Sequence, residues 1–105
     1  MENTNCPITI KIDEEQSYSI DFDKIKKHYI VKLEDKTFKM TKKGVLMFFV
    51  QRIKNLWDDG IEMITFECCS IERYILVQTE FNDDCKEEIE NHINFFLEFQ
   101  LETFL

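Results

Sequence analysis

The chain has 105 residues, of which 44% are hydrophobic and 13% aromatic, and 21 acidic residues outnumber 13 basic ones to give a formal net charge of −8. This is typical of one compact domain, residues 1–105, and the two Gly and one Pro exclude collagen-like and low-complexity chains. No apolar run approaches the ~20 residues of a membrane span, and no signal-peptide pattern follows Met1. We therefore expect a cytoplasmic protein that has no contact with membranes.

The four cysteines are Cys6, Cys68, Cys69 and Cys85. Disulfides form mainly in oxidising compartments, whereas this chain shows no export signal and has enough Phe, Ile and Leu to fill a core. We expect reduced cysteines, with Cys68 packed as a small hydrophobic residue.

Alternation of apolar and polar residues predicts strands that each bury one face. Four strands are predicted in this way before the middle of the chain, at 8–12, 17–22, 29–33 and 38–40. The polar residues 13–16 and 34–36 suit the turns of two hairpins. The segment 24–28 is either a loop or a single helical turn.

An amphipathic helix is predicted after Thr41, a residue type that commonly caps helices. Apolar residues follow at three- and four-residue spacing, which places on one helix face Val45, Phe48, Phe49, Ile53, Leu56 and Trp57. Gly60 can adopt the positive φ that ends a helix. Asp58 and Asp59 in the last turn oppose the helix dipole, at a cost of about a few tenths of a kcal/mol each, which indicates a use outside folding.

A third hairpin and a long helix complete the chain. Strands are predicted at 61–69 and 73–81, and the helix at 85–104, where Gly and Pro are absent. Asn82, Asp83 and Asp84 are candidate caps for this helix, and Asp84 and Glu87 have the spacing of a capping box. Strands joined by hairpins form an antiparallel sheet, and two helices can cover one of its faces. We therefore predict an α+β fold, a two-layer sandwich of an antiparallel sheet built from β-hairpins with two helices on one face.

The charge is divided unevenly along the chain. Residues 1–56 contain 11 basic and 8 acidic residues, whereas residues 57–105 contain 2 basic and 13 acidic ones. An acidic surface of this strength repels nucleic acid and attracts basic proteins. The alternative is a solvated face that keeps the chain soluble.

No motif for catalysis or cofactor binding is present. Two glycines cannot form a phosphate-binding loop, and Cys85 with His92 would supply two ligands of a zinc site that needs about four. We expect His92 to be a hydrogen-bonded residue at the edge of the core. The sequence therefore predicts a protein that is not an enzyme and has no cofactor or metal.

The candidate partner-binding residues are Trp57, Asp58, Asp59, Glu62, Asp83, Asp84, Glu87, Glu88 and Glu90. Trp57 completes the apolar helix face, which places it in the core. The other interpretation makes Trp57 an aromatic anchor inside an acidic rim, as in an interface hot spot.

We favour a small inhibitor that neutralises a larger basic protein, such as a nuclease or a nucleic-acid-binding effector. In being short, acidic and without catalytic motifs, the chain is similar in type to toxin-immunity and anti-CRISPR proteins, although it shares no motif with a particular family. A second hypothesis is a homo-oligomeric scaffold or adaptor, in which Phe95, Phe99 and Phe104 of the last helix associate with a second copy. A third is a nucleic-acid-binding module built on the basic segment 24–54, which its scattered lysines and scarce arginines disfavour.

Overall fold

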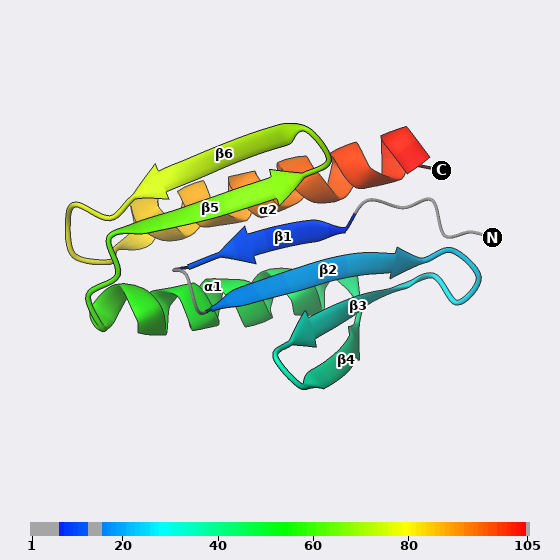
Figure 1. Ribbon diagram of the computed structural model, residues 1–105. Helices are drawn as coiled ribbons and strands as arrows, with labels where there is room; N and C mark the ends of the chain where they lie inside the picture. The colour runs from blue at the N-terminus through cyan, green and yellow to red at the C-terminus, as the bar shows by residue number, and fades with distance from the viewer. Residues whose placement is uncertain (1–6, 13–15, 105) are drawn as a thin grey trace.

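The computed structural model describes residues 7–12 and 16–104, with side chains described up to Leu101. Its elements, in chain order, are β1 (Ile8–Lys11), β2 (Ser17–Asp23), β3 (His28–Leu33), β4 (Lys36–Met40), α1 (Lys42–Asp58), β5 (Met63–Cys68), β6 (Ile71–Leu76) and α2 (Asp83–Phe104) (Figure 1). The strands form one antiparallel sheet in the order β4-β3-β2-β1-β5-β6. Both helices pack against the sheet on one side, so the predicted α+β fold is confirmed.

The strand β1 joins the two parts of the sheet, because it pairs with β2 on one edge and with β5 on the other. Ile8 lies opposite Ile20 of β2 on one edge and opposite Cys68 of β5 on the other. The chain therefore forms a four-stranded meander, β1 to β4, and a separate hairpin, β5–β6, that joins the meander at β1. The hairpin pattern in the sequence predicts the local pairs, but the β1–β5 pair links residues about 60 positions apart and has no local signal.

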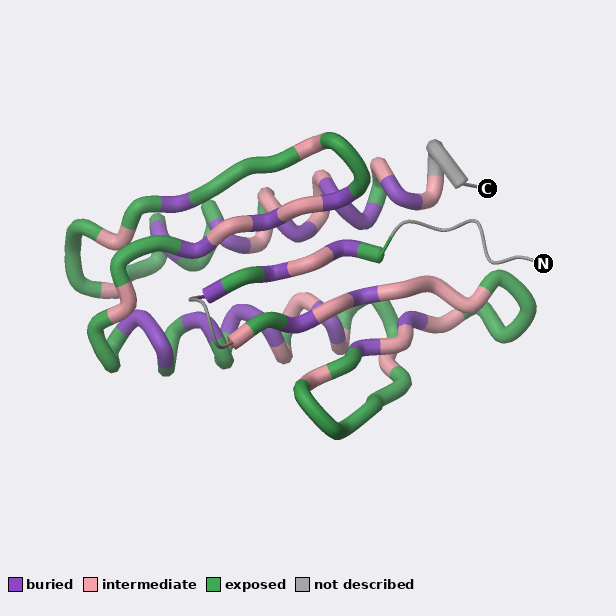
Figure 2. Tube along the Cα trace, viewed as in Figure 1, coloured by how far each residue is buried: buried purple, intermediate pink, exposed green. Residues whose placement is uncertain are grey.

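The core lies between the sheet and the helices. Buried and less buried residues alternate along the four inner strands, β1, β2, β3 and β5, as period-2 geometry requires (Figure 2). The fully buried side chains include Ile10, Ile20, Val31, Phe49, Ile53, Ile64, Phe66, Cys68, Ile89, Phe96 and Leu97. Each large aliphatic or aromatic side chain among them contributes roughly 1.5–3 kcal/mol to folding by leaving water. Burial of Cys68 confirms its predicted place in the core.

The first helix begins and ends where the sequence indicates. The Thr41 hydroxyl accepts a 3.1 Å hydrogen bond from the Gly44 N–H, which satisfies one of the free donors of the first turn. The helix ends at Asp58, and Gly60 follows with a φ of +96°. Between β2 and β3, residues 24–27 form a turn, in which the Asp23 carboxylate accepts from the Ile25 and Lys26 N–H groups.

Three expectations for the second half of the chain need correction. The last strand covers Ile71–Leu76 instead of 73–81, because a two-residue turn starts it earlier and residues 77–82 leave the sheet as a loop. The second helix starts at Asp83 instead of Cys85. Of the three candidate caps, Asn82 is the one used, because its Oδ1 accepts from the Cys85 N–H at 3.0 Å, so the expected capping box of Asp84 and Glu87 does not form the helix start.

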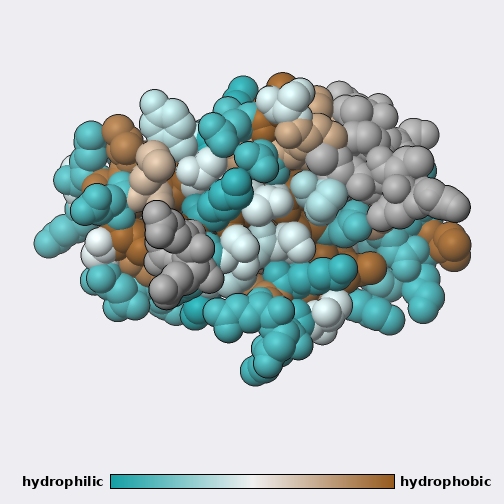
Figure 3. Space-filling view, viewed as in Figure 1, coloured by the Kyte–Doolittle hydropathy of each residue, from teal (hydrophilic) through white to brown (hydrophobic). Residues whose placement is uncertain are grey.

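The face of the sheet opposite the helices is open. Its middle carries short hydroxyl side chains, including Thr9, Ser19 and Thr65, and the Lys11 ammonium lies 3.6 Å from the Glu67 carboxylate. Figure 3 shows this face, where hydrophilic groups dominate and most apolar groups lie toward the margins. Between described residues, ion pairing is confined to Lys11 and Glu67.

Candidate protein-binding site

Many of the carboxylates that the sequence singles out lie at one end of the molecule. There α1 ends, β5 begins, β6 ends and α2 begins (Figure 1). We call this region the acidic end and define it by Asp58, Asp59, Glu62, Glu80, Asp83, Asp84, Glu87 and Glu88, which are all exposed. No described lysine forms an ion pair with these carboxylates. Residues far apart in the chain thus form one region of negative charge.

Lysines gather at the opposite end. The turn 24–27 contains three lysines, and β4 leads from Lys39 directly to Lys42 and Lys43 at the start of α1. Because Tyr29 pairs with Met40, the turn before β3 and the start of α1 lie close together. The molecule extends over 43 × 27 × 25 Å, and charges are screened over about 8 Å at physiological salt. The lysine-rich end therefore lies apart from the acidic end, where Lys11 and Lys54 each line a pocket together with Glu62.

The loop of the acidic end is held by Trp57. The indole ring is 6% exposed, its Nε1–H donates a 2.6 Å hydrogen bond to the Thr79 carbonyl, and it meets the Phe81 ring edge to face at 5.5 Å. Trp57 is therefore a core residue, and its interpretation as a projecting anchor is wrong. It fixes the loop on which Glu80 lies, beside an open pocket of about 860 Å³ that also borders Asp58, Glu62 and Lys54.

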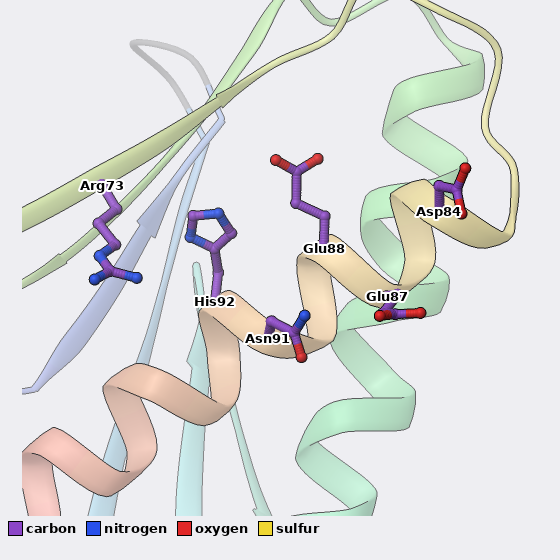
Figure 4. A pocket seen from close by; sticks show the side chains of 6 residues that line it. All are labelled: Arg73, Asp84, Glu87, Glu88, Asn91 and His92. Atoms are coloured by element: carbon purple, nitrogen blue, oxygen red, sulfur yellow. The ribbon is translucent and has the colours of Figure 1, made fainter.

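A second pocket lies between β6 and the first turns of α2. It has a volume of about 400 Å³ and is lined by Arg73, Asp84, Glu87, Glu88, Asn91 and His92 (Figure 4). In the close-up, Arg73 comes from the strand and the other side chains come from the helix. Arg73 does not pair with a carboxylate, because its guanidinium lies over the Phe95 ring at 3.8 Å. The carboxylates of Asp84, Glu87 and Glu88 in this pocket therefore stay available to a basic side chain of another molecule.

His92 lies at the inner end of this pocket. Its ring stacks on Phe66 with centroids 5.3 Å apart and an interplanar angle of 9°. Burial lowers the pKa of His92, the Glu88 carboxylate opposes this shift, and Arg73 adds to it. The buried Nδ1 has no hydrogen-bond partner in the described part of the chain, so the expectation of a hydrogen-bonded histidine is wrong in that respect.

Glu90 does not belong to the acidic end. It is half-buried and faces the groove between the two helices, where Lys54 and Lys86 also lie. Asp83 lines the same groove, and neither lysine forms an ion pair with Asp83 or Glu90. The other seven predicted carboxylates, Asp58, Asp59, Glu62, Asp83, Asp84, Glu87 and Glu88, are brought together.

The apolar half of α2 is mostly part of the core. Phe96 and Leu97 are buried, and the Gln100 amide donates to the Ile20 carbonyl at 3.3 Å. Phe95 and Phe99 are half-buried and stack on each other at 6.3 Å, and Arg73 covers Phe95. Phe95 and Phe99, two of the three aromatic residues expected to self-associate, are therefore already engaged in contacts within the chain. The third, Phe104, lies outside the described side chains.

Sequence reasoning missed one cluster on the open face. Met63 and Leu76 are cross-strand partners, Tyr74 lies next along β6, and these side chains are 44%, 51% and 59% exposed. The signal was present, because an inward Ile75 places its neighbours Tyr74 and Leu76 outward. The apolar alternation continues past Leu76, so the predicted strand 73–81 extends beyond the end of β6.

Comparison of the chain with protein-family models, with curated proteins and with solved structures finds no match. None of the described helices is both long enough and apolar enough to span a membrane. Among the described residues, no group of three or more His, Cys, Asp or Glu side chains is arranged to hold a metal ion. The candidate function therefore depends on the charge and shape of the acidic end.

Proposed function

We propose that the protein is a small inhibitor that binds a larger basic protein through its acidic end and covers a surface that would otherwise contact nucleic acid. The observation that carries this proposal is the gathering of carboxylates from α1, β5, the loop 77–82 and α2 at one end. A surface of one sign steers an oppositely charged partner and raises the association rate above that of neutral surfaces.

The arrangement also favours recognition over a purely structural role for part of this charge. Asp58 and Asp59 stand at the C-terminal end of α1, where the helix dipole disfavours carboxylates. The loop 77–82 is fixed by the hydrogen bond from the Trp57 indole to the Thr79 carbonyl. The backbone of the next residue, Glu80, is therefore held in place. Surface charges that are positioned before binding lose less conformational freedom when a partner arrives.

A matched pair of double variants tests the proposal. The variant Asp58→Asn with Glu62→Gln removes two charges from the acidic end, whereas Glu34→Gln with Asp35→Asn removes two from the β3–β4 turn. We would measure association rates against a panel of basic nucleases and nucleic-acid-binding effector complexes, at increasing salt. We expect the first variant to associate severalfold more slowly with its partner and to lose part of the salt dependence.

The control variant should bind as the unmodified protein does, because its net charge changes by the same amount at a different place. Equal slowing of both variants would mean that net charge alone acts. Binding that is indifferent to salt and to both variants would reject docking through the acidic end.

A further inference from the structure

The outer edge of β6 has backbone groups that point away from the sheet. The Val77 N–H donates to the Glu62 carbonyl at 2.8 Å, and directly opposed pairs in an antiparallel ladder alternate between hydrogen-bonded and non-hydrogen-bonded. The register therefore directs the backbone N–H and C=O groups of Glu72, Tyr74 and Leu76 outward, away from β5. In the described part of the chain no strand lies beyond β6.

The two edges of the sheet differ in how they are protected. The edge strand β4 carries Lys36 and Lys39, and charged lysines on an edge discourage pairing with another chain. The strand β6 also carries two charged residues, Glu72 and Arg73, but their charges are opposite, and beside them Tyr74 and Leu76 are aromatic or apolar and more than half exposed. An edge of this kind is the one at which an added strand finds both backbone partners and apolar contacts.

The residues around β6 determine which kinds of side chain an added strand would need. On the open side of the sheet, Met63, Tyr74 and Leu76 form an exposed apolar cluster. On the helix side, Arg73 and the exposed Asp84, Glu87 and Glu88 carboxylates line one pocket (Figure 4). Side chains of a strand alternate between the two faces. A complementary strand would therefore place apolar residues on one face and basic residues on the other.

We propose that β6 binds an extended segment of the basic partner as a seventh strand, with alternating basic and apolar side chains. This inference rests on the proposed function and names the way in which the partner is recognised. Backbone hydrogen bonds supply affinity in this mode, and the alternating side chains supply specificity. Pairing of β6 with a second copy is disfavoured, because each copy carries a net charge of −8 and its own acidic pocket beside the strand.

The test uses a synthetic peptide of alternating Lys and Val, with an alternating Glu and Val peptide as the charge control. Hydrogen exchange of individual amides is followed by NMR in the full-length protein. With the Lys peptide, we expect the amides of Glu72, Tyr74 and Leu76 to exchange about tenfold or more slowly. Amides of the β4 edge should be unaffected, and the Glu peptide should give no protection.

A pair of variants separates backbone pairing from side-chain contact. Tyr74→Pro removes an outward N–H that β5 does not use, a substitution that edge strands tolerate, whereas Tyr74→Ala removes only the ring. We expect the Pro variant to lose peptide binding by at least about tenfold and the Ala variant to lose it by a smaller factor. If the Pro variant fails to fold, the exchange measurement on the unmodified protein still decides.

Three results would overturn the inference. If the Lys peptide shifts resonances of the acidic end but leaves the three β6 amides unprotected, strand addition is wrong while electrostatic docking stands. Equal protection by the Glu peptide would reject a basic segment as the occupant. Protection that rises with protein concentration in the absence of peptide would identify a second copy as the occupant instead.

Discussion

Trp57 and Thr79 are joined by a 2.6 Å hydrogen bond from the indole nitrogen to the backbone carbonyl. The bond connects the last turn of α1 to the loop that leads into α2, and the Phe81 ring packs edge to face against the same indole. The loop 77–82 contains no regular structure, and this side chain attaches its middle to the core, while the Val77 N–H bond to the Glu62 carbonyl attaches its start. Stability and the shape of the acidic end therefore depend on the same residue.

Replacing Trp57 should destabilise the protein in two steps. Trp57→Phe keeps most of the ring but removes the donor to the carbonyl of the exposed Thr79, which water can then hydrate, at a cost of about 0.5–1.5 kcal/mol. Trp57→Ala also opens a cavity and should cost about 3–5 kcal/mol. Denaturant unfolding measures both. Met47→Ala, at a 64% exposed position of the same helix, should stay within about 0.5 kcal/mol, and a Trp57→Phe value in that range would show that the hydrogen bond contributes little.

The carboxylates at the ends of the two helices should affect stability with opposite signs. Neutralising Asp58 to Asn removes a charge that the C-terminal end of α1 disfavours, so the free energy of unfolding should rise by about 0.3–1 kcal/mol at low salt. Asp84→Asn removes a charge that the N-terminal end of α2 favours, so stability should fall by a similar amount. Denaturation at low and high salt checks both signs. A loss of stability in the Asp58 variant would remove the argument that this residue is kept for binding.

Protonation of His92 should lower stability below neutral pH. The pKa of His92 is lowered in the folded protein, so the unfolded chain binds more protons as pH falls. The contribution of neutral His92 is fully present above about pH 6.5, the unfolded value, and is lost as pH falls toward the lower folded pKa. Unfolding measured across this range should show the slope, and His92→Phe should flatten it.

Two neighbours should move the pKa of His92 in opposite directions. Glu88→Gln removes a charge that raises it, so the pKa should fall further, whereas Arg73→Ala removes a charge that lowers it, so the pKa should rise. NMR titration of the His92 ring measures these shifts directly. Shifts of the same sign in the two variants would contradict the geometry of the pocket in Figure 4.

The cap of α2 should depend on an acceptor at position 82. Asn82→Ala removes the oxygen that accepts from the Cys85 N–H and should cost about 1 kcal/mol, within a range of about 0.5–2. Asn82→Asp keeps an acceptor and adds a charge that suits a helix N-terminus, so it should be close to neutral. Thermal unfolding compares the two. Equal losses would show that the Asn82 amide group has a role other than capping.

Features that depend on residues close together in the chain could be predicted from the sequence. Thr41 and Gly60 mark the ends of α1 through their own conformational preferences, and alternating apolar residues identify each strand of the meander. The end of β6 could not be predicted in the same way. Val77 and Phe81 continue the apolar alternation, but they pack beside the core from a loop that the Trp57 indole holds. A tertiary contact thus overrides the strand pattern.

The sequence predicts the charge of the candidate site, but it does not predict which carboxylates belong to the site. The excess of carboxylates after residue 57 gives the sign of the surface, and the meeting of four element ends places most of them together. Which of them stay exposed depends on three-dimensional neighbours. Glu90 is half-buried in the groove between the helices, which Lys54 of α1 and Lys86 of α2 also line, and Arg73 turns to the Phe95 ring instead of a carboxylate.

The central position of β1 also affects how the protein acquires its fold. The meander β1 to β4 can assemble from neighbouring segments, whereas the hairpin β5–β6 joins it only by closing a loop of more than forty residues onto β1. Contacts of such long sequence separation slow folding. Until that closure, the free side of β1 is an unprotected apolar edge, so the interval before β5 arrives is the stage at which a nascent chain is most exposed to aggregation.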